Sequence, residues 1–188
     1  MVLNPEPHCV ELVYAGQNVA VTETATSFEN ERQKVEISLV KSIEQNERFG
    51  IGNNGKMKNI SFGLFAAEEI VSASGTSIPA NGLVEIISLN EDGTAKIKTD
   101  LPFGSYYVQE LATDSHYKLS DTKYPVTFGY AGQDTAVVKI AVNDGNAVEN
   151  KLIYGSVSGK KVDENGDSLG GALIGLFRTD DGEFTKEN

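Results

Sequence analysis

Hydrophobic and polar residues alternate along several short stretches of this chain. In "VEISLVK", residues 35–41, Val35, Ile37 and Leu39 fall on every second position, which is the period of a β-strand with one apolar face. Similar stretches rich in Val, Ile, Tyr and Phe lie at 59–68, 82–89, 94–99, 105–111, 124–130 and 135–142. Turn clusters such as "NEDG" and "YAGQ" separate them, so the pattern predicts an all-β antiparallel sandwich. One helical turn is expected near "AAEEIVSA".

Three polar side chains interrupt the apolar faces of these strands. Lys41 ends the face of the first stretch, Glu110 shares a face with Val108, and Asn150 shares a face with Val148. A lysine at a strand end ordinarily extends its ammonium group to water along its four-carbon stem. Three such placements on three strands favour a different interpretation, in which the polar groups meet inside the core.

An internal repeat supports the second interpretation. "YAGQ" occurs at 14–17 and 130–133, each time followed by an extended segment ending in Asn30 or Asn150, which are 120 residues apart. Lys161 follows Lys41 by the same 120 residues. The sequence after Asn150, "GSVSGKKVDENGDSLGGALIGLF", repeats the layout that begins at Val35, with a shorter loop.

The repeat predicts the domain organisation. Residues 34–152 form one complete unit, 1–33 are the last strands of a preceding unit, and 153–188 are the first strands of a following one. Both ends therefore resemble cuts from a longer array. The junction "NKLIYGS" has no flexible Pro/Gly/Ser-rich linker, so neighbouring units of the same polypeptide are expected to be closely joined partners.

Composition narrows the function classes. The 188 residues include 27 acidic and 16 basic ones, for a formal charge of -11, which argues against nucleic acid or an anionic membrane as the main partner. No secretory signal or membrane-spanning run is present, so any export signal or anchor is expected outside this segment. The single cysteine, Cys9, excludes an intrachain disulfide and is expected to face a small apolar site.

Motifs of conventional enzymes and cofactor sites are missing from the sequence. The two histidines, His8 and His116, have no metal-ligand spacing, and no nucleophile elbow or phosphate loop occurs. "DENGDS" at 163–168 begins like a calcium loop but has Gly166 in the fourth position, so it is interpreted as a hairpin turn. We therefore expect no turnover enzyme, no cofactor and no metal.

The three polar residues suggest a single-turnover reaction. Burial favours the neutral form of an amine and of a carboxylic acid. A neutral Lys41 amine could attack the Asn150 side-chain carbonyl while Glu110 donates a hydrogen bond and transfers protons. The product would be a Lys–Asn isopeptide bond between the first and last strands, formed autocatalytically as ammonia leaves.

The combined motifs resemble a known family. "VEISLVK", "FGLF", "LPFGSYYVQEL" and "VEN", followed by a restart at residue 155, are similar to the Cna-B or SpaA-type prealbumin-like repeats of Gram-positive surface adhesins and pilins. The resemblance implies a transthyretin-like or inverse immunoglobulin-like sandwich. It also implies that Lys41 and Asn150 form the isopeptide bond, with Glu110 as the catalytic acid and Asn30 and Lys161 as equivalent unpaired positions. This chain has "ELATDSHY" where many relatives have an "E..AP.GY" turn.

Two functions follow as expectations. The resemblance implies a structural stalk repeat of a secreted adhesin or pilus-like protein at the cell wall, whose parent binds a host or glycan ligand. Alternatively, the unit is itself a recognition module for glycan or host protein. In that case the loops at 42–58 and 73–82 form the surface, and tyrosines such as Tyr106, Tyr107, Tyr117 and Tyr124 provide stacking groups.

Overall fold

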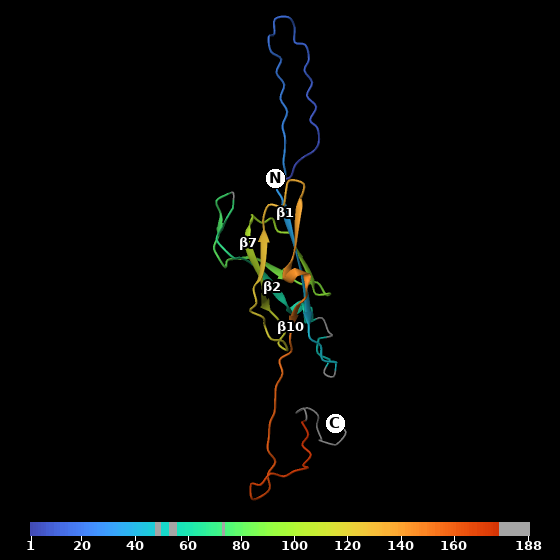
Figure 1. The fold of residues 1–188 in the computed structure, drawn as a ribbon, viewed down its shortest axis with the longest axis vertical. Coiled ribbons are helices and arrows are strands. Elements are labelled where there is room, and N and C mark those ends of the chain that lie inside the picture. Colours follow the sequence, from blue (N-terminus) through green and yellow to red (C-terminus); the bar gives the residue numbers. More distant parts are fainter. Residues whose placement is uncertain (48–49, 53–55, 73, 177–188) are drawn as a thin grey trace. The chain divides into compact units, whose positions relative to one another are not determined.

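The computed structural model describes residues 1–47, 50–52, 56–72 and 74–176. The chain divides into two compact units, Met1–Ile153 and Tyr154–Asn188. All the named strands of the described residues belong to the first unit (Figure 1). The elements are β1 (Lys34–Ile43), η2 (Lys56–Asn59), β2 (Ser61–Ala66), β3 (Ile70–Val71), β4 (Ser77–Ile78), β5 (Leu83–Ser88), β6 (Thr94–Ile97), β7 (Gly104–Ala112), β8 (Tyr124–Phe128), β9 (Val137–Ala141), η3 (Val142–Gly145) and β10 (Val148–Asn150).

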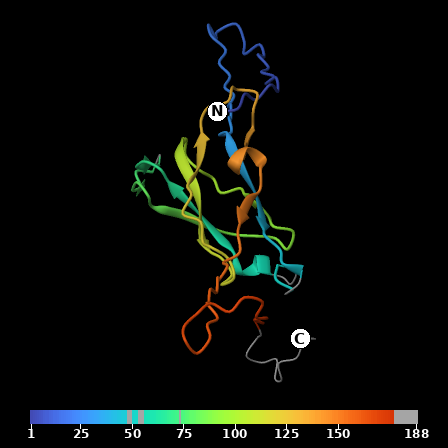
Figure 2. The ribbon, with the colours of Figure 1, turned by 60° about the horizontal axis from the view of Figure 1, so that its bottom comes forward.

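Two four-stranded sheets make up the sandwich. The first has the order β10-β1-β6, with β9 also paired to β1, and the second has the order β5-β2-β7-β8. The sheets lie face to face, as the two views in Figures 1 and 2 show. The all-β fold class predicted from the sequence is therefore confirmed, and β3 and β4 add a separate two-stranded hairpin.

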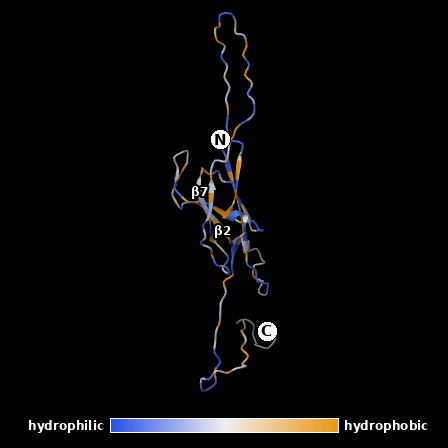
Figure 3. Cartoon of the chain, viewed as in Figure 1, coloured by the Kyte–Doolittle hydropathy of each residue, from blue (hydrophilic) through white to orange (hydrophobic). Residues whose placement is uncertain are grey.

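The core lies between the two sheets and follows the alternation in the sequence. Along β1, Val35, Ile37, Leu39 and Lys41 are buried, while the residues between them are half-buried or exposed. Figure 3 shows the same mixture of hydrophobic and hydrophilic positions along the strands. The fully buried side chains that fill the core from both sheets include Ile37, Leu39, Phe62, Leu64, Tyr106, Val108, Val126 and Phe128.

Strand β1 pairs in parallel with both β9 and β10, unlike the antiparallel pairs elsewhere in the sandwich. Strand β9 pairs with residues 34–38 of β1, and β10 pairs with residues 41–43. Between β9 and β10, the chain has four more residues than the facing part of β1. The 3-10 helix η3 lies in this segment, and its Val142 is buried in the core. This insertion sets the register in which Asn150 lies opposite Ile43.

The helical turn expected near "AAEEIVSA" is wrong for the part of that stretch that the structure describes. Ile70 and Val71 form β3 instead, pairing with Ser77 and Ile78 of β4. Both are β-branched residues that favour extended backbone, and Ile70 is buried against the core. Strand propensity and the burial of Ile70 thus both favour the extended conformation here.

Residues 1–33, all of which the structure describes, contain no strand. Asn30 is exposed, and so is Cys9. The expectation that Cys9 faces an apolar site is wrong, because this segment builds no core of its own. Its assignment to a preceding repeat stays a prediction.

The second unit is described from Tyr154 to Leu176 and contains one isolated bridge, Val162 with Ser168. Between these residues the Asp163 carboxylate accepts hydrogen bonds from two backbone amides of the turn, so the hairpin predicted for "DENGDS" is confirmed. Lys161 is exposed. None of the helices in the described ranges has the length and hydropathy required to cross a bilayer.

Gly93 is expected to tolerate no side chain. Its φ is +80°, and a Cβ would lie 2.4 Å from the backbone oxygen of Lys41. We expect Gly93→Ala to lower the free energy of unfolding by about 2 kcal/mol or more, through left-handed backbone strain and displacement of β1. Gly129→Ala is the matched control, because a Cβ there meets nothing within 4 Å. Denaturant titration measures both, and equal effects would contradict the prediction.

Candidate functional site

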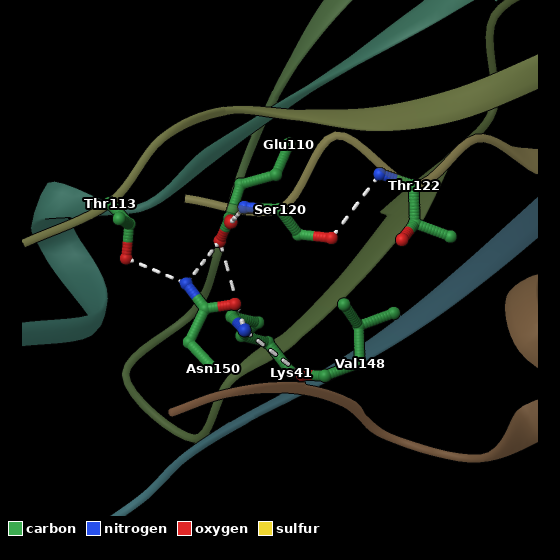
Figure 4. A network of polar contacts seen from close by, with 7 residues as sticks. All are labelled: Lys41, Glu110, Thr113, Ser120, Thr122, Val148 and Asn150. Atoms are coloured by element: carbon green, nitrogen blue, oxygen red, sulfur yellow. Dashed lines mark hydrogen bonds and ion pairs between the residues drawn. The ribbon is translucent and has the colours of Figure 1, made fainter. Parts of the chain in front are cut away.

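The sandwich brings Lys41, Glu110 and Asn150 together in its interior (Figure 4). Lys41 lies on β1 and Asn150 on β10 of the first sheet, whereas Glu110 comes from β7 of the second sheet. All three are buried: the side chains of Lys41 and Glu110 are 0% and 1% exposed, and Asn150 is 1% exposed. The interpretation that Lys41 extends its ammonium group to water is therefore wrong, because its side chain is fully buried.

Glu110 Oε1 lies between the amine and the amide. It is 3.7 Å from Lys41 Nζ and accepts a hydrogen bond of 2.8 Å from Asn150 Nδ2. Lys41 Nζ also donates to the backbone oxygen of Val148, at 3.0 Å. One carboxylate oxygen thus contacts both nitrogen-bearing groups that a Lys–Asn condensation would use.

Burial changes the acid–base state of Lys41. Loss of hydration lowers the Lys41 pKa from 10.5 to about 8, while attraction to Glu110 opposes part of that shift. A pKa near 8 gives a substantial fraction of neutral amine close to neutral pH. Because only the neutral amine is nucleophilic, a lowered pKa is the change that a nucleophilic lysine requires.

Two further groups hold the site, and the sequence pattern missed both. The backbone amide of Ser120 donates to Glu110 Oε2 at 2.9 Å. The Thr113 hydroxyl oxygen accepts the second hydrogen bond of Asn150 Nδ2, at 2.8 Å, the same distance as the bond from Nδ2 to Glu110 Oε1. Both belong to the loop after β7. The two-residue strand period, which made the other three residues recognisable in the sequence, does not apply in a loop. The only sequence signal is that Thr113 follows Glu110 by three residues.

The arrangement matches the requirements of amide exchange. An amine, a carboxyl group and a carboxamide lie together in a buried, largely apolar core, where fixed proximity can replace a bimolecular encounter. Among the described residues, no three His, Cys, Asp or Glu side chains gather as a metal site.

The tyrosines proposed for ligand stacking are mostly occupied inside the protein. Tyr106 and Tyr117 are buried, and their hydroxyls donate to backbone oxygens of Pro102 and Glu44. Tyr107 is 7% exposed and stacks on Phe65. These contacts give no support to a recognition surface built from tyrosines, and the loop at 42–58 lies partly outside the described residues.

Comparison with protein families gives a match over residues 50–146 to the SpaA family, described as a prealbumin-like fold domain. This span is just over half of the 188 residues. The chain belongs to the SpaA family. The family resemblance inferred from the sequence is thus confirmed, and the family's prealbumin-like fold agrees with the all-β sandwich of the structure.

Solved structures similar to this SpaA-family chain include two bacterial pilins and the TIE protein of Bacillus anthracis. The Bacillus anthracis TIE protein is 19% identical over 67% of this chain, with a TM-score of 0.40. The minor pilin GBS52 of Streptococcus agalactiae is 17% identical over 69%, with a TM-score of 0.41. The major pilin SpaA of Corynebacterium diphtheriae is 17% identical over 63%, with a TM-score of 0.36. This chain spans 19%, 49% and 30% of those chains. No curated protein matches it in sequence.

The lowered Lys41 pKa can be measured directly in an Asn150→Leu variant, which removes the carboxamide and leaves the amine free. We expect Lys41 to titrate near pH 8 because burial disfavours its charged form. Adding Glu110→Gln should lower the Lys41 pKa further, since the Glu110 charge raises it. NMR of the lysine ε-methylene groups against pH reports both values. A Lys41 that titrates near its ordinary 10.5 would contradict this account of the site.

Proposed function

We propose that residues 34–152 are a structural stalk repeat of a secreted bacterial adhesin or pilus-like protein, cross-linked by an autocatalytic isopeptide bond between Lys41 and Asn150. One observation carries the proposal. Glu110 Oε1 lies 3.7 Å from Lys41 Nζ and 2.8 Å from Asn150 Nδ2, in a site that excludes water.

The proposed reaction is balanced by these three side chains. The neutral Lys41 amine attacks Cγ of Asn150, so that the Nζ–Cγ bond forms and the Cγ–Nδ2 bond breaks. A proton passes from Nζ to Glu110 Oε1 and from there to Nδ2, which leaves as ammonia. Glu110 returns to its starting state, and no other reactant is needed.

The bond would lie directly in the path of a pulling force. Strands β1 and β10 are adjacent and parallel, and they carry the first and last strand residues of the unit. Force that enters at the start of β1 and leaves after β10 would pass through the Lys41–Asn150 link. Residues 42–149 would then be bypassed and would stay folded under load, as a stalk requires.

The cross-link would also stabilise a protein that lacks disulfides. Cys9 is the only cysteine. A link that closes a loop of roughly 100 residues lowers the entropy of the unfolded chain by an amount worth about 4–5 kcal/mol, by analogy with a disulfide. Such stabilisation suits a protein exposed outside the cell.

The stalk proposal includes tandem neighbours. Asn30 and Lys161 stand 120 residues from Asn150 and Lys41, so we assign them to the equivalent bonds of the preceding and following repeats. Neighbouring repeats would then be the direct partners of this unit, at the cell wall of a Gram-positive bacterium. Ligand binding would belong to other parts of the parent protein.

Intact mass tests the cross-link. We expect the unmodified chain to be lighter than its sequence mass by one ammonia. Glu110→Gln should keep its full mass, because glutamine fills the same space but cannot transfer the proton. Glu149→Gln is the control: it removes an exposed carboxylate from the neighbouring position on β10 and should still lose ammonia. Full mass in the unmodified chain would overturn the proposed function.

The rate of ammonia loss should depend on pH through Lys41. As pH rises through about 8, the neutral fraction of the amine grows and bond formation should accelerate. The chain can be made by cell-free synthesis and kept unfolded in acidic denaturant. Dilution into buffers of increasing pH then starts folding, and intact mass measured over time gives the rate of ammonia loss. A rate that stays constant or falls between neutral pH and pH 8 would contradict the assignment of Lys41 as the nucleophile.

A further inference from the structure

The Asn150 carboxamide is held by two oxygens from the same stretch of chain. Its nitrogen donates to Glu110 Oε1 and to Thr113 Oγ1, each at 2.8 Å, so both of its hydrogens have acceptors. The carbonyl oxygen Oδ1 is buried and has no hydrogen-bond partner among the described residues. The orientation of this amide is therefore fixed from its nitrogen side.

We propose that Thr113 is a positioning residue for isopeptide formation, and this inference rests on the proposed function. Its hydroxyl accepts a hydrogen bond from Asn150 Nδ2, the leaving nitrogen, and so keeps that nitrogen next to Glu110 Oε1. Glu110 Oε1 is the atom that would deliver the proton. Without that hydroxyl the amide is held by one oxygen only, and it can rotate about its Cβ–Cγ bond away from the line between Lys41 and Glu110. Thr113 would thus act on the reaction through Asn150, without exchanging protons itself.

The loop that carries Thr113 is fastened to the strands that the bond would join. Tyr117 Oη donates to the backbone oxygen of Glu44, just beyond β1. Just beyond β10, the backbone amide of Lys118 donates to Lys151 O, and that of Ile153 donates to His116 O. Figure 4 shows Thr113 and Ser120 approaching the site from this loop.

These attachments give the placement of Thr113 a consequence for folding. Because these hydrogen bonds attach the loop to the ends of both β1 and β10, we expect the loop to reach its observed position once both ends are in place. The amide is therefore fully held only after the last strand has paired in its observed register. Under this proposal, bond formation would be coupled to completion of the sandwich.

Three variants test the role of the hydroxyl. Each is synthesised cell-free, kept unfolded in acidic denaturant and diluted into buffer, and its ammonia loss is followed by intact mass. Thr113→Val keeps the side-chain shape and removes the hydroxyl, so ammonia loss should be about fivefold to tenfold slower, the effect of one hydrogen bond. Thr113→Ser restores the hydroxyl and should react within about twofold of the unmodified chain. Thr127→Val makes the same change at an exposed position on β8 and should leave the rate unchanged. An unmodified rate in Thr113→Val, or a Thr113→Ser variant as slow as Thr113→Val, would overturn the proposal.

A second measurement separates this proposal from the proposed function. In a Lys41→Met background no bond can form, and NMR can follow hydrogen exchange of the Asn150 side-chain amide. Exchange should be faster when Thr113→Val is added and unchanged when Thr113→Ser is added; equal exchange in both would overturn the contact. If the unmodified chain loses no ammonia, the proposed function fails and this role fails with it. If it loses ammonia as fast with valine as with threonine at 113, only the role of Thr113 fails.

Discussion

The burial of the Lys41 amine beside the Glu110 carboxyl group is the constraint on which the arrangement of the sandwich depends. Removing either group would leave the other buried without water or a polar partner, at a cost of about 3–5 kcal/mol where the remaining group stays charged. Here the partners come from opposite sheets, β1 and β7. Their contact therefore fixes the spacing and register of the two sheets at the end of the core where β10 also lies.

Strand β1 is the element that carries this constraint to the rest of the unit. It pairs with β6 on one edge and with β9 and β10 on the other. The four residues of η3 separate β9 from β10, so these two strands pair with the same edge of β1 in different registers. Val142 of η3 fills the core at this break between the strands. Asn150 thereby reaches the carboxyl group that Lys41 requires. The geometry of the site is a property of strand pairing as much as of the three side chains.

Much of the site could be predicted because Lys41, Glu110 and Asn150 all sit on strands. A period of two assigns each strand residue to a face, so a polar residue on an apolar face is visible in the sequence. Thr113 follows the end of β7, where no period applies, and its contact depends on how one loop folds back. The parallel pairing of β1 likewise depends on long-range topology. Ile70 shows the opposite case, since its burial and its strand propensity together override the local helical pattern.

The lowered pKa of Lys41 comes from its surroundings in the folded unit. Lys41 has a lowered pKa because two sheets exclude water around it. A short motif around a lysine therefore cannot by itself specify a nucleophile. The buried environment of Lys41 forms only when the sandwich closes over it, so the proposed cross-link would be tied to finished folding.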